Sequence, residues 1–432
     1  MKNTVVVGAQ WGDEGKAKIT DLLAKQADVI IRYQGGCNAG HTVVANGKTY
    51  KFHLIPSGIL YDDKMCVIGA GTVIHPAVLM DEINDLIAKG IDTQALKISH
   101  LAHLTMPYHI DLDGADEAKL GKNKIGTTKR GIGPTYTDKM ARIGFRIEDL
   151  YDEELLDEKI NKILPIKNQQ LEQNYGLKPY SKEEIKEFCS KYAELLKPYV
   201  DFELLDKLHD DYKAGKTILF EGAQGALLDI DFGTYPYVTS SNPVAGGAFT
   251  GTGLGATVVE EIIGVFKAYI TRVGEGPFVT ELEDEEGAKI QEIGQEFGVT
   301  TGRKRRCGWF DVPLAKYSAQ INGMTGIALT KLDVFDGFEK IKLCTAYIDK
   351  RNGETYTSYQ TNINTHKYLE PVYQVFEGWC EDTTKAKTFE DLPLNAKIYL
   401  KELETLVRTP IKIISVGPDR EQTIFNTCLA SV

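Results

Sequence analysis

The sequence predicts an α/β protein with a large, mostly parallel central β-sheet that is flanked by helices. An apolar strand at Thr4–Val7 passes through a glycine-rich turn into a helical stretch, and a second apolar strand follows at Val29–Ile31. This strand–helix–strand order is typical of βαβ units, whose strands are parallel. Further short apolar runs recur along the chain as strand candidates, at Thr217–Phe220, Ile262–Ile270, Gly326–Thr330 and Ile411–Val416.

The segments between these strands contain the predicted helices. Glu14–Gln26 has its aliphatic residues at helical spacing, and Pro76–Lys89 begins with proline, which is favoured in the first turn of a helix. The stretch Asp149–Lys213 is charged and poor in glycine, so we interpret it as a helical insertion rather than a separate catalytic domain.

Two further segments are defined by their turn residues. Asn46-Gly47 separates Thr42–Ala45 from Lys48–Phe52, which predicts a β-hairpin. From Gly222 to Gly255 the chain is dominated by Gly, Ser, Thr and Pro, and a loop of that length in a compact protein is usually functional or disordered.

The composition excludes several classes of function. The chain has 432 residues and a net charge of −11, which argues against a general nucleic-acid or membrane-surface role. An anionic substrate would therefore need a local positive site. The chain shows no signal-peptide core and no apolar run of about 18 residues that could span a membrane. The seven cysteines are scattered without metal-binding spacing, which is typical of reduced thiols, so we expect a soluble cytoplasmic protein.

The glycine-rich turn Gly8–Lys18 is the most informative segment. It lies between a buried strand and a helix, where backbone N–H groups and a lysine can hold phosphate. It departs from the usual P-loop, because six residues separate Gly8 from Gly15-Lys16 and because Ala17 stands where a hydroxyl would bind Mg²⁺. A metal ion here needs another oxygen ligand, and Asp13 is the candidate.

A second glycine-rich loop, Gly35–Thr42, follows the next strand. Loops after successive parallel strands meet at the carboxyl edge of the sheet, so Asp13 and His41 are expected to face one pocket. A carboxylate and an imidazole in one pocket suit the roles of base and acid.

The C-terminal third offers a base-recognition motif. A predicted strand runs into Thr330-Lys331-Leu332-Asp333, and an aspartate after such a strand can accept hydrogen bonds from N1–H and the 2-amino group of guanine. Adenine has no such donor pair and would leave the acid unpaired. Ser415-Val416-Gly417, after the last strand, can close the same pocket.

Val299–Arg306 is the dense basic cluster of the chain, and it follows Thr-Thr-Gly rather than standing as an isolated charge run. Arginine suits bidentate binding of carboxylate and phosphate, so this cluster supplies the positive site that the acidic chain needs. The loops Gly126–Pro134, Glu221–Gly225 and Val238–Pro243 read as turns on their own.

Together these motifs resemble the adenylosuccinate synthetase family, in order and in spacing, over essentially the whole chain. The matching segments are Gln10–Lys16, Asn38–Thr42, Gly126–Thr128, Glu221–Gly225, Thr300–Arg303, Cys307–Asp311 and Thr330–Asp333. The resemblance implies a single catalytic domain over residues 1–432, with 149–213 as a helical insertion, and a homodimer. It also implies GTP-dependent ligation of L-aspartate to IMP, the first committed step from IMP to AMP in purine nucleotide biosynthesis.

The resemblance also implies residue roles. Asp13 is the base that removes the N1 proton of IMP and a ligand of one Mg²⁺ per subunit, the Gly40 carbonyl is a second ligand, and His41 is the acid that stabilises the leaving GDP. The implied GTP-binding residues are Gly12, Asp13, Glu14, Gly15, Lys16, Ala17, Lys18, Gly40, His41, Thr42, Arg305, Lys331, Leu332, Asp333, Ser415, Val416 and Gly417.

The other substrates have implied contacts as well. Those for IMP are Asp13, Lys16, Asn38, His41, Thr128, Arg142, Gln224, Thr239 and Arg303, of which Arg142 reaches the neighbouring site of the dimer. Those for aspartate are Val299, Thr300, Thr301, Gly302, Arg303, Lys304 and Arg305. The implied chemistry has two steps: O6 of deprotonated IMP attacks the γ-phosphate of GTP, and the aspartate amine then displaces phosphate from 6-phosphoryl-IMP.

One departure from the family concerns Ala17, where the family normally has glycine. A methyl group there either crowds the phosphate or, at helical dihedral angles, is harmless, and we favour the second reading. Two other functions stay open. A related synthetase that acts on another purine monophosphate, such as a guanylate, is disfavoured by Asp13, and a non-catalytic GTP-binding switch is disfavoured by the extra loops and the basic cluster.

Overall fold

A ten-stranded sheet forms the centre of the computed structural model, which describes residues 1–45, 48–121, 126–297 and 304–426. Its strand order is β20-β19-β15-β11-β1-β10-β2-β5-β7-β9, and every neighbouring pair is parallel except β19 and β20. The predicted mostly parallel sheet is therefore confirmed. In chain order its strands are β1 (Thr4–Gly8), β2 (Val29–Arg32), β5 (Met65–Ile68), β7 (Leu96–Ser99), β9 (Val200–Asp201), β10 (Ile218–Glu221), β11 (Glu261–Lys267), β15 (Gly326–Thr330), β19 (Ile411–Ser415) and β20 (Thr423–Phe425).

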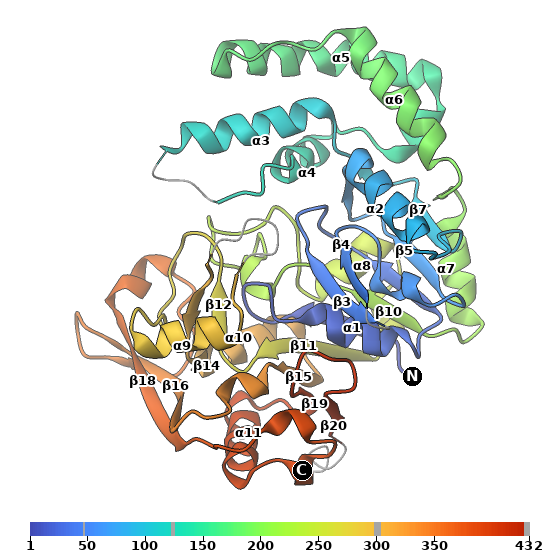
Figure 1. The fold of residues 1–432 in the computed structure, drawn as a ribbon. Coiled ribbons are helices and arrows are strands. Elements are labelled where there is room, and N and C mark those ends of the chain that lie inside the picture. The colour runs from blue at the N-terminus through green and yellow to red at the C-terminus, as the bar shows by residue number, and fades with distance from the viewer. Residues whose placement is uncertain (46–47, 122–125, 298–303, 427–432) are drawn as a thin grey trace.

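Helices surround this sheet, and α3, α4, α5 and α6 gather beyond α2, at the top of Figure 1. In the described part of the chain the α-helices are α1 (Lys16–Ala24), α2 (Pro76–Ala88), α3 (Pro107–Lys119), α4 (Ile132–Ala141), α5 (Glu153–Gln169), α6 (Lys182–Leu196), α7 (Leu204–Lys213), α8 (Gly246–Thr252), α9 (Glu285–Ile293), α10 (Val312–Asn322) and α11 (Leu394–Val407).

The described residues also form smaller sheets outside the central one. The predicted hairpin is confirmed as β3 (His41–Ala45) paired antiparallel with β4 (Lys48–Phe52), although its turn lies outside the described residues. The other strands outside the central sheet are β6 (Val73–Ile74), β8 (His103–Leu104), β12 (Ile270–Arg272), β13 (Arg306–Gly308), β14 (Phe310–Asp311), β16 (Lys340–Asp349), β17 (Thr355–Tyr356) and β18 (Leu369–Glu377). β12 pairs with β13, which fixes the chain that leaves the basic cluster.

Three predictions of local structure need correction. The apolar run 262–270 is two strands, β11 and β12, because both are buried and hydrophobicity alone cannot show where the chain changes sheets. The stretch 149–213 is largely helical as predicted, but its residues Val200–Asp201 form β9 at the edge of the central sheet.

The third correction concerns 222–255, which contains the helix α8. Its glycines serve close packing: a Cβ at Gly247 would lie 2.2 Å from the Asn242 carbonyl oxygen, and one at Gly251 would lie 2.0 Å from that of Tyr33. Glycine therefore lets α8 lie directly against neighbouring backbone.

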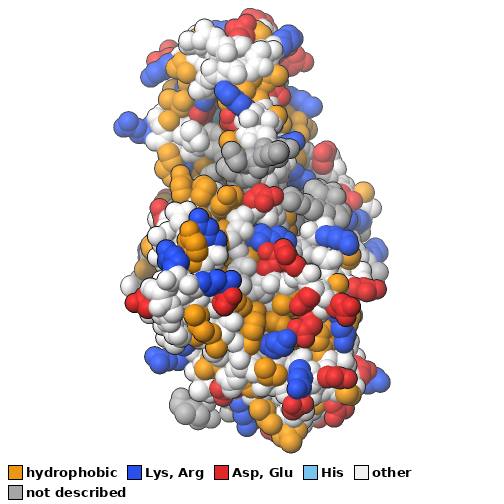
Figure 2. Space-filling model, turned by 90° about the vertical axis from the view of Figure 1, so that its left-hand side faces the viewer, with side chains coloured by type: hydrophobic (Ala, Val, Ile, Leu, Met, Phe, Trp, Pro, Cys, Tyr) orange, Lys and Arg blue, Asp and Glu red, His pale blue; other side chains and the backbone are white. Residues whose placement is uncertain are grey.

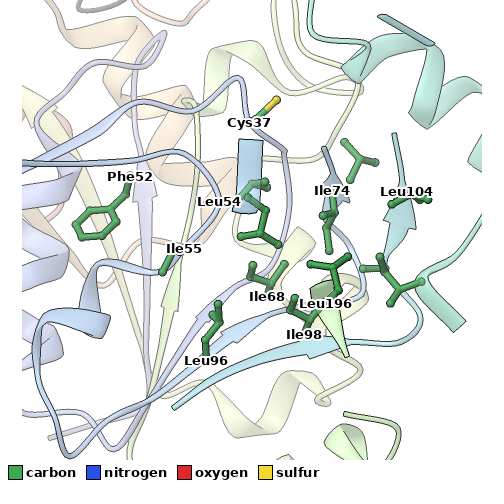
Figure 3. Close-up of a cluster of buried hydrophobic side chains, with 14 of the residues drawn as sticks. Cys37, Phe52, Leu54, Ile55, Ile68, Ile74, Leu96, Ile98, Leu104 and Leu196 are labelled. Carbon is green, nitrogen blue, oxygen red and sulfur yellow. The ribbon is translucent and has the colours of Figure 1, made fainter. Parts of the chain in front are cut away.

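The core is continuous from the sheet into the helical layer. Figure 3 shows part of it, where side chains from β5, β7 and the segment after β4 meet Leu196 of α6 and Leu104 of β8. The central strand β1 is buried throughout. Such burial of strands on both faces is typical of parallel sheets covered by helices.

The surface carries charges of both signs. On the face shown in Figure 2, acidic and basic side chains are interspersed. Within the described ranges, no helix is long and apolar enough to cross a bilayer.

Candidate active site

Five of the loops singled out in the sequence lie at one edge of the central sheet. They directly follow the carboxyl ends of β1, β2, β10, β15 and β19, which are parallel strands of the same sheet. This is where ligands bind in open α/β sheets.

The loop after β1 leads into α1 with an open N-terminus. Gly15 precedes the helix at φ +81°, and no side chain of the described residues caps the first turn. The N–H groups of that turn are therefore available to an anion, in the field of the helix dipole. Ala17 lies inside α1, so its dihedral angles are those of an ordinary helical residue.

Glu14 shapes this loop from within. Its buried carboxylate accepts hydrogen bonds from the backbone N–H of Gln10 at 3.0 Å and of Gly12 at 2.9 Å, and it pairs with the Lys16 ammonium at 2.6 Å. The loop is thus held in its curved form without a ligand. Lys16 is buried, and its charge is already neutralised by Glu14.

Two glycines bring the loop after β10 against the phosphate loop. A Cβ at Gly8 would lie 2.4 Å from the Gln224 carbonyl oxygen, and one at Gly225 would lie 2.4 Å from the Gly12 nitrogen. Any larger residue would push the two loops apart. The Thr330 hydroxyl, at the end of β15, donates to the Glu14 carbonyl at 2.6 Å and ties in a third loop.

Asp13 extends from this junction toward solvent. It has a left-handed backbone (φ +58°), and about a third of its side chain is exposed. Its carboxylate lies 2.8 Å from Nε of Arg305. The predicted base and the predicted GTP-binding arginine therefore form an ion pair in this structure.

His41, at the start of β3, is buried against Glu221 at the end of β10. Its Nδ1 lies 2.6 Å from the Glu221 carboxylate and 3.3 Å from the Arg32 guanidinium. Its Nε2 is buried and has no hydrogen-bond partner among the described residues. Burial and the charge of Arg32 lower the pKa of His41, although Glu221 opposes them. The imidazole is therefore neutral at pH 7.

Glu296 gathers cations near the basic cluster. Its fully buried carboxylate accepts from Lys267 at 2.9 Å, from Lys331 at 2.9 Å, from Arg305 at 2.8 Å and from the Tyr269 hydroxyl at 2.5 Å. Burial alone would raise the pKa of Glu296, but Lys267, Lys331 and Arg305 outweigh it and hold that pKa well below its usual range.

The proposed base pocket contains a carboxylate oxygen that lacks a donor. Oδ1 of Asp333 is buried and has no hydrogen-bond partner in the described part of the chain, and burial raises the pKa of Asp333. Such a group gains from a ligand that brings N–H donors. Nearby, the Lys18 ammonium donates to Oγ of Ser415 at 2.8 Å and to the Gly417 carbonyl at 2.7 Å, which joins α1 to the loop after β19. Burial lowers the pKa of Lys18 to about 8.

Three of the residues assigned to IMP are linked by hydrogen bonds. The Gln224 amide donates to Asn38 Oδ1 at 3.0 Å, and the Asn38 amide donates to the Thr239 hydroxyl at 3.5 Å. They come from loops that are far apart in sequence. The buried Oε1 of Gln224 and that of Gln34 beside it have no partner in the structure as described.

Thr128 and Arg142 lie toward the helical layer, at the two ends of the segment that contains α4. Thr128 is exposed in a loop whose backbone is held by Glu117 of α3, which accepts from the N–H groups of Gly126 and Thr127. Arg142 caps α4 in a left-handed conformation (φ +62°), and its exposed side chain has no partner within the described ranges. Neither residue is tied to the Asp13 junction by a hydrogen bond in those ranges.

Most of the predicted aspartate loop lies outside the described residues, namely Val299, Thr300, Thr301, Gly302 and Arg303. Lys304 and Arg305 are described, and Lys304 is exposed beside the buried Arg305. Leu332 and Val416 are fully buried, so they contribute to the pocket through their backbone or as packing beneath it.

The predicted magnesium ligands fit a site that is completed by phosphate. Gly40 is exposed and has open space around its Cα, and Asp13 offers a partly exposed carboxylate. Among the residues described, no cluster of three or more His, Cys, Asp or Glu side chains could hold a metal ion by itself. Mg²⁺ commonly uses one or two protein oxygens together with substrate phosphates, so the donor set is suitable.

Sequence reasoning missed Glu221, Arg32 and Glu296 as functional candidates. Arg32 and Glu221 are charged residues at the ends of otherwise apolar strands, and this is the feature that could have identified them. Glu296 follows α9 without any regular pattern around it.

Comparisons with known proteins agree with this geometry. The family model described as adenylosuccinate synthetase matches residues 5–424. A relative named adenylosuccinate synthetase from Caldanaerobacter subterraneus subsp. tengcongensis is 54% identical over 427 residues, covering 98% of this chain and 99% of that protein. The solved structure of a fully ligated adenylosuccinate synthetase from Plasmodium falciparum matches with a TM-score of 0.92 and 41% identity, over 98% of this chain and all of that one.

A second solved structure resembles the fold alone. The succinoaminodeoxyadenylate synthetase of cyanophage S-2L, bound to dGMP and dATP, gives a TM-score of 0.62 at 18% identity, over 98% of this chain and 95% of that one. The full-length match to the family model and the close relatives decide the assignment: this chain belongs to the adenylosuccinate synthetase family.

Proposed function

We propose that this ligase joins the amino group of L-aspartate to C6 of IMP at the expense of GTP, through 6-phosphoryl-IMP. One observation carries the proposal: the loops after β1, β10 and β15 are in direct contact at the Asp13 junction, where glycines allow close approach and Thr330 bonds to Glu14. Phosphate, base and substrate groups can therefore share one site.

The phosphates of GTP would lie at the N-terminus of α1, against uncapped N–H groups and Lys16. The guanine would lie over Asp333, whose free oxygen accepts from guanine N–H groups. Lys18 and Ser415 would close this pocket from the side of β19.

Asp13 would remove the N1 proton of IMP. In this structure it is paired with Arg305, so binding of the nucleotides exchanges that pair: Arg305 turns to phosphate, and Asp13 turns to the purine. The O6 atom of deprotonated IMP then attacks the γ-phosphate of GTP, and GDP leaves. The aspartate amine then attacks C6 of 6-phosphoryl-IMP and displaces O6 as inorganic phosphate. The protein contributes positioning and neutralisation of charge.

His41 would donate a hydrogen bond to the leaving GDP. Its imidazole is neutral here, and the approach of phosphate oxygens would raise its pKa and favour protonation at Nε2. Asp13 and the Gly40 carbonyl would hold Mg²⁺, which neutralises phosphate charge when bound.

The segment Val299–Arg305 would bind the carboxylates of aspartate, and the chain would act as a homodimer. The exposed, unpartnered Arg142 supports the second point, because a guanidinium held at a fixed helix end is available to a neighbouring subunit.

An assay with each component omitted in turn tests the proposal. The protein is mixed with IMP, GTP, aspartate and Mg²⁺, and adenylosuccinate and phosphate are measured. Product is expected only when all four are present, and ATP should replace GTP poorly. Turnover of dGMP in preference to IMP would favour the guanylate alternative. Binding of GTP without any phosphate release would favour a switch.

A further inference from the structure

We propose that Glu221 is a positioning residue for His41. Glu221 holds the imidazole with its Nδ1–H toward β10, so that Nε2 faces the phosphate oxygens of the leaving GDP. The role of His41 itself rests on the proposed function. The orientation and tautomer rest on the structure alone.

The tautomer follows from the chemistry of the contact. Nδ1 of His41 lies 2.6 Å from Oε1 of Glu221. The Arg32 guanidinium, which can only donate, lies farther from Nδ1, at 3.3 Å. An ionised carboxylate can only accept hydrogen bonds, so the much shorter contact with Glu221 places the proton on Nδ1. The hydrogen bond from His41, the charge of Arg32 and the hydrogen bond from the Ser57 backbone outweigh the effect of burial and lower the pKa of Glu221 to about 2, so this carboxylate is ionised at neutral pH.

The carboxylate is itself held rigidly. Its Oε2 accepts from both the backbone N–H and the hydroxyl of Ser57, each at 2.9 Å. Glu221 and Ser57 are both fully buried. The group therefore has one orientation, and the imidazole that it binds has one orientation too.

The free nitrogen points to a ligand. Nε2 of His41 is buried, with no hydrogen-bond partner among the described residues, although a buried polar atom is normally paired. In the Nδ1–H tautomer, Nε2 is the site that can take up a proton. A phosphate oxygen that lies near Nε2 would favour protonation and receive the hydrogen bond.

The charges that face His41 come from three elements. Glu221 on β10 favours the imidazolium, and Arg32 on β2 and Lys16 on α1 oppose it. Asp21 on α1 and Cys66 on β5 interact with Glu221 rather than with the ring. Glu221 is therefore the one facing group among the described residues that stabilises the protonated ring.

Glu221→Gln removes this charge and keeps the shape. We expect kcat to fall by about 10²–10⁴-fold, as for loss of the carboxylate that orients a catalytic histidine. The KM values for IMP and GTP should change by less than about 3-fold, because the variant removes no direct substrate contact. Glu221→Asp should restore part of the turnover.

Glu82→Gln is a matched control. Glu82 is a buried carboxylate nearby that accepts from the backbone N–H groups of His53, Leu54 and Ile55 and does not touch His41. Burial raises the pKa of Glu82 to about 7, so this carboxyl group is only partly ionised at neutral pH. Its replacement by an amide therefore removes only part of a charge. This variant should leave kcat within about 3-fold of the wild type, because it removes no contact of His41. A fall in kcat as large as that of Glu221→Gln would overturn the proposal.

A measurement without turnover separates this inference from the proposed function. ¹⁵N-histidine spectra of the wild type, assigned with His41→Asn, should show His41 as the Nδ1–H tautomer at pH 8. An Nε2–H tautomer in the wild type would overturn the inference even if Glu221→Gln does not fold. An enzyme without adenylosuccinate activity but with the expected tautomer would overturn only the function.

Discussion

Two buried carboxylates serve the same edge of the sheet in opposite ways. Glu221 binds one imidazole and the two donors of Ser57, with one cation, Arg32, farther away at 3.4 Å, and thereby fixes a single reactive nitrogen. Glu296 binds three cations and a tyrosine hydroxyl. The first cluster orients a group, and the second concentrates positive charge.

The second cluster provides a local positive site on a chain whose net charge is −11. A positive site on an acidic protein must be held together against the mutual repulsion of its cations. Glu296 does this for Lys331, which is one-third exposed, and for Arg305 and Lys267, which are buried. Arg305 also reaches Asp13, so the cluster includes an ion pair that substrates can exchange.

The largest effect is expected for Asp13→Asn, which removes the ion pair of Asp13 with Arg305 and leaves Glu296 in place. Turnover should fall by about 10²–10⁴-fold, because an amide cannot take the N1 proton of IMP. The free energy of unfolding should change by less than about 1 kcal/mol, since Asp13 is partly exposed. Steady-state kinetics and urea denaturation would measure the two quantities, and turnover like that of the wild type would exclude Asp13 as the base.

Glu296→Gln tests the view that this carboxylate holds the cations together. Its loss leaves Lys267 buried without a counter-charge, and the free energy of unfolding should fall by about 3–5 kcal/mol. Asp157→Asn, which breaks surface pairs with Lys182 and Lys186, is the control and should leave the free energy of unfolding nearly unchanged. Equal losses in denaturant titrations would remove the distinction between the two kinds of pair.

Acid titration tests how much the Glu221 cluster contributes to stability. The folded-state pKa of Glu221 is depressed to about 2, so its contribution to stability is present above its usual pKa and is lost as the pH falls toward 2. Glu221 contributes about 3 kcal/mol to the free energy of unfolding, because a difference of one pKa unit between the folded and unfolded states corresponds to about 1.36 kcal/mol. Glu221→Gln should therefore lose less stability than the wild type between about pH 5 and pH 2. Parallel curves from urea titrations at each pH would contradict this assignment.

The sequence located most of the site but not what holds it together. Apolar runs and glycine-rich turns placed the phosphate loop, His41 and Lys331–Asp333 at one sheet edge, because short-range patterns encode strand ends. The partners of Glu221 and Glu296 left no such pattern: His41 and Glu221 are 180 residues apart, and Lys267 and Glu296 are 29 apart. Contacts of this kind exist only after the sheet has formed, and so does the switch from β11 to β12 that the apolar run concealed.

Asp333→Asn examines the base pocket next to the Glu296 cluster. The amide replaces an acceptor with a donor toward guanine, so the KM for GTP should rise by about 10–100-fold, equivalent to about 1–3 kcal/mol. The KM for IMP should change little, because Asp333 belongs to the loop after β15 and not to the Asn38–Gln224 group. Initial-rate kinetics with GTP and ITP, which lacks the 2-amino group, would measure the preference. An unchanged preference would place guanine recognition elsewhere.

The smallest effect is expected for Ala17→Gly, in the first turn of α1. Ala17 is buried in the first turn of α1 at helical dihedral angles, so its methyl group stabilises the helix. Restoring glycine should lower the free energy of unfolding by about 0.5–1 kcal/mol. If the methyl does not crowd the phosphate, the KM for GTP should stay within about twofold of the wild type. A large fall in that KM would show that Ala17 narrows the phosphate site, and that the loop held by Glu14 is less tolerant than its geometry indicates.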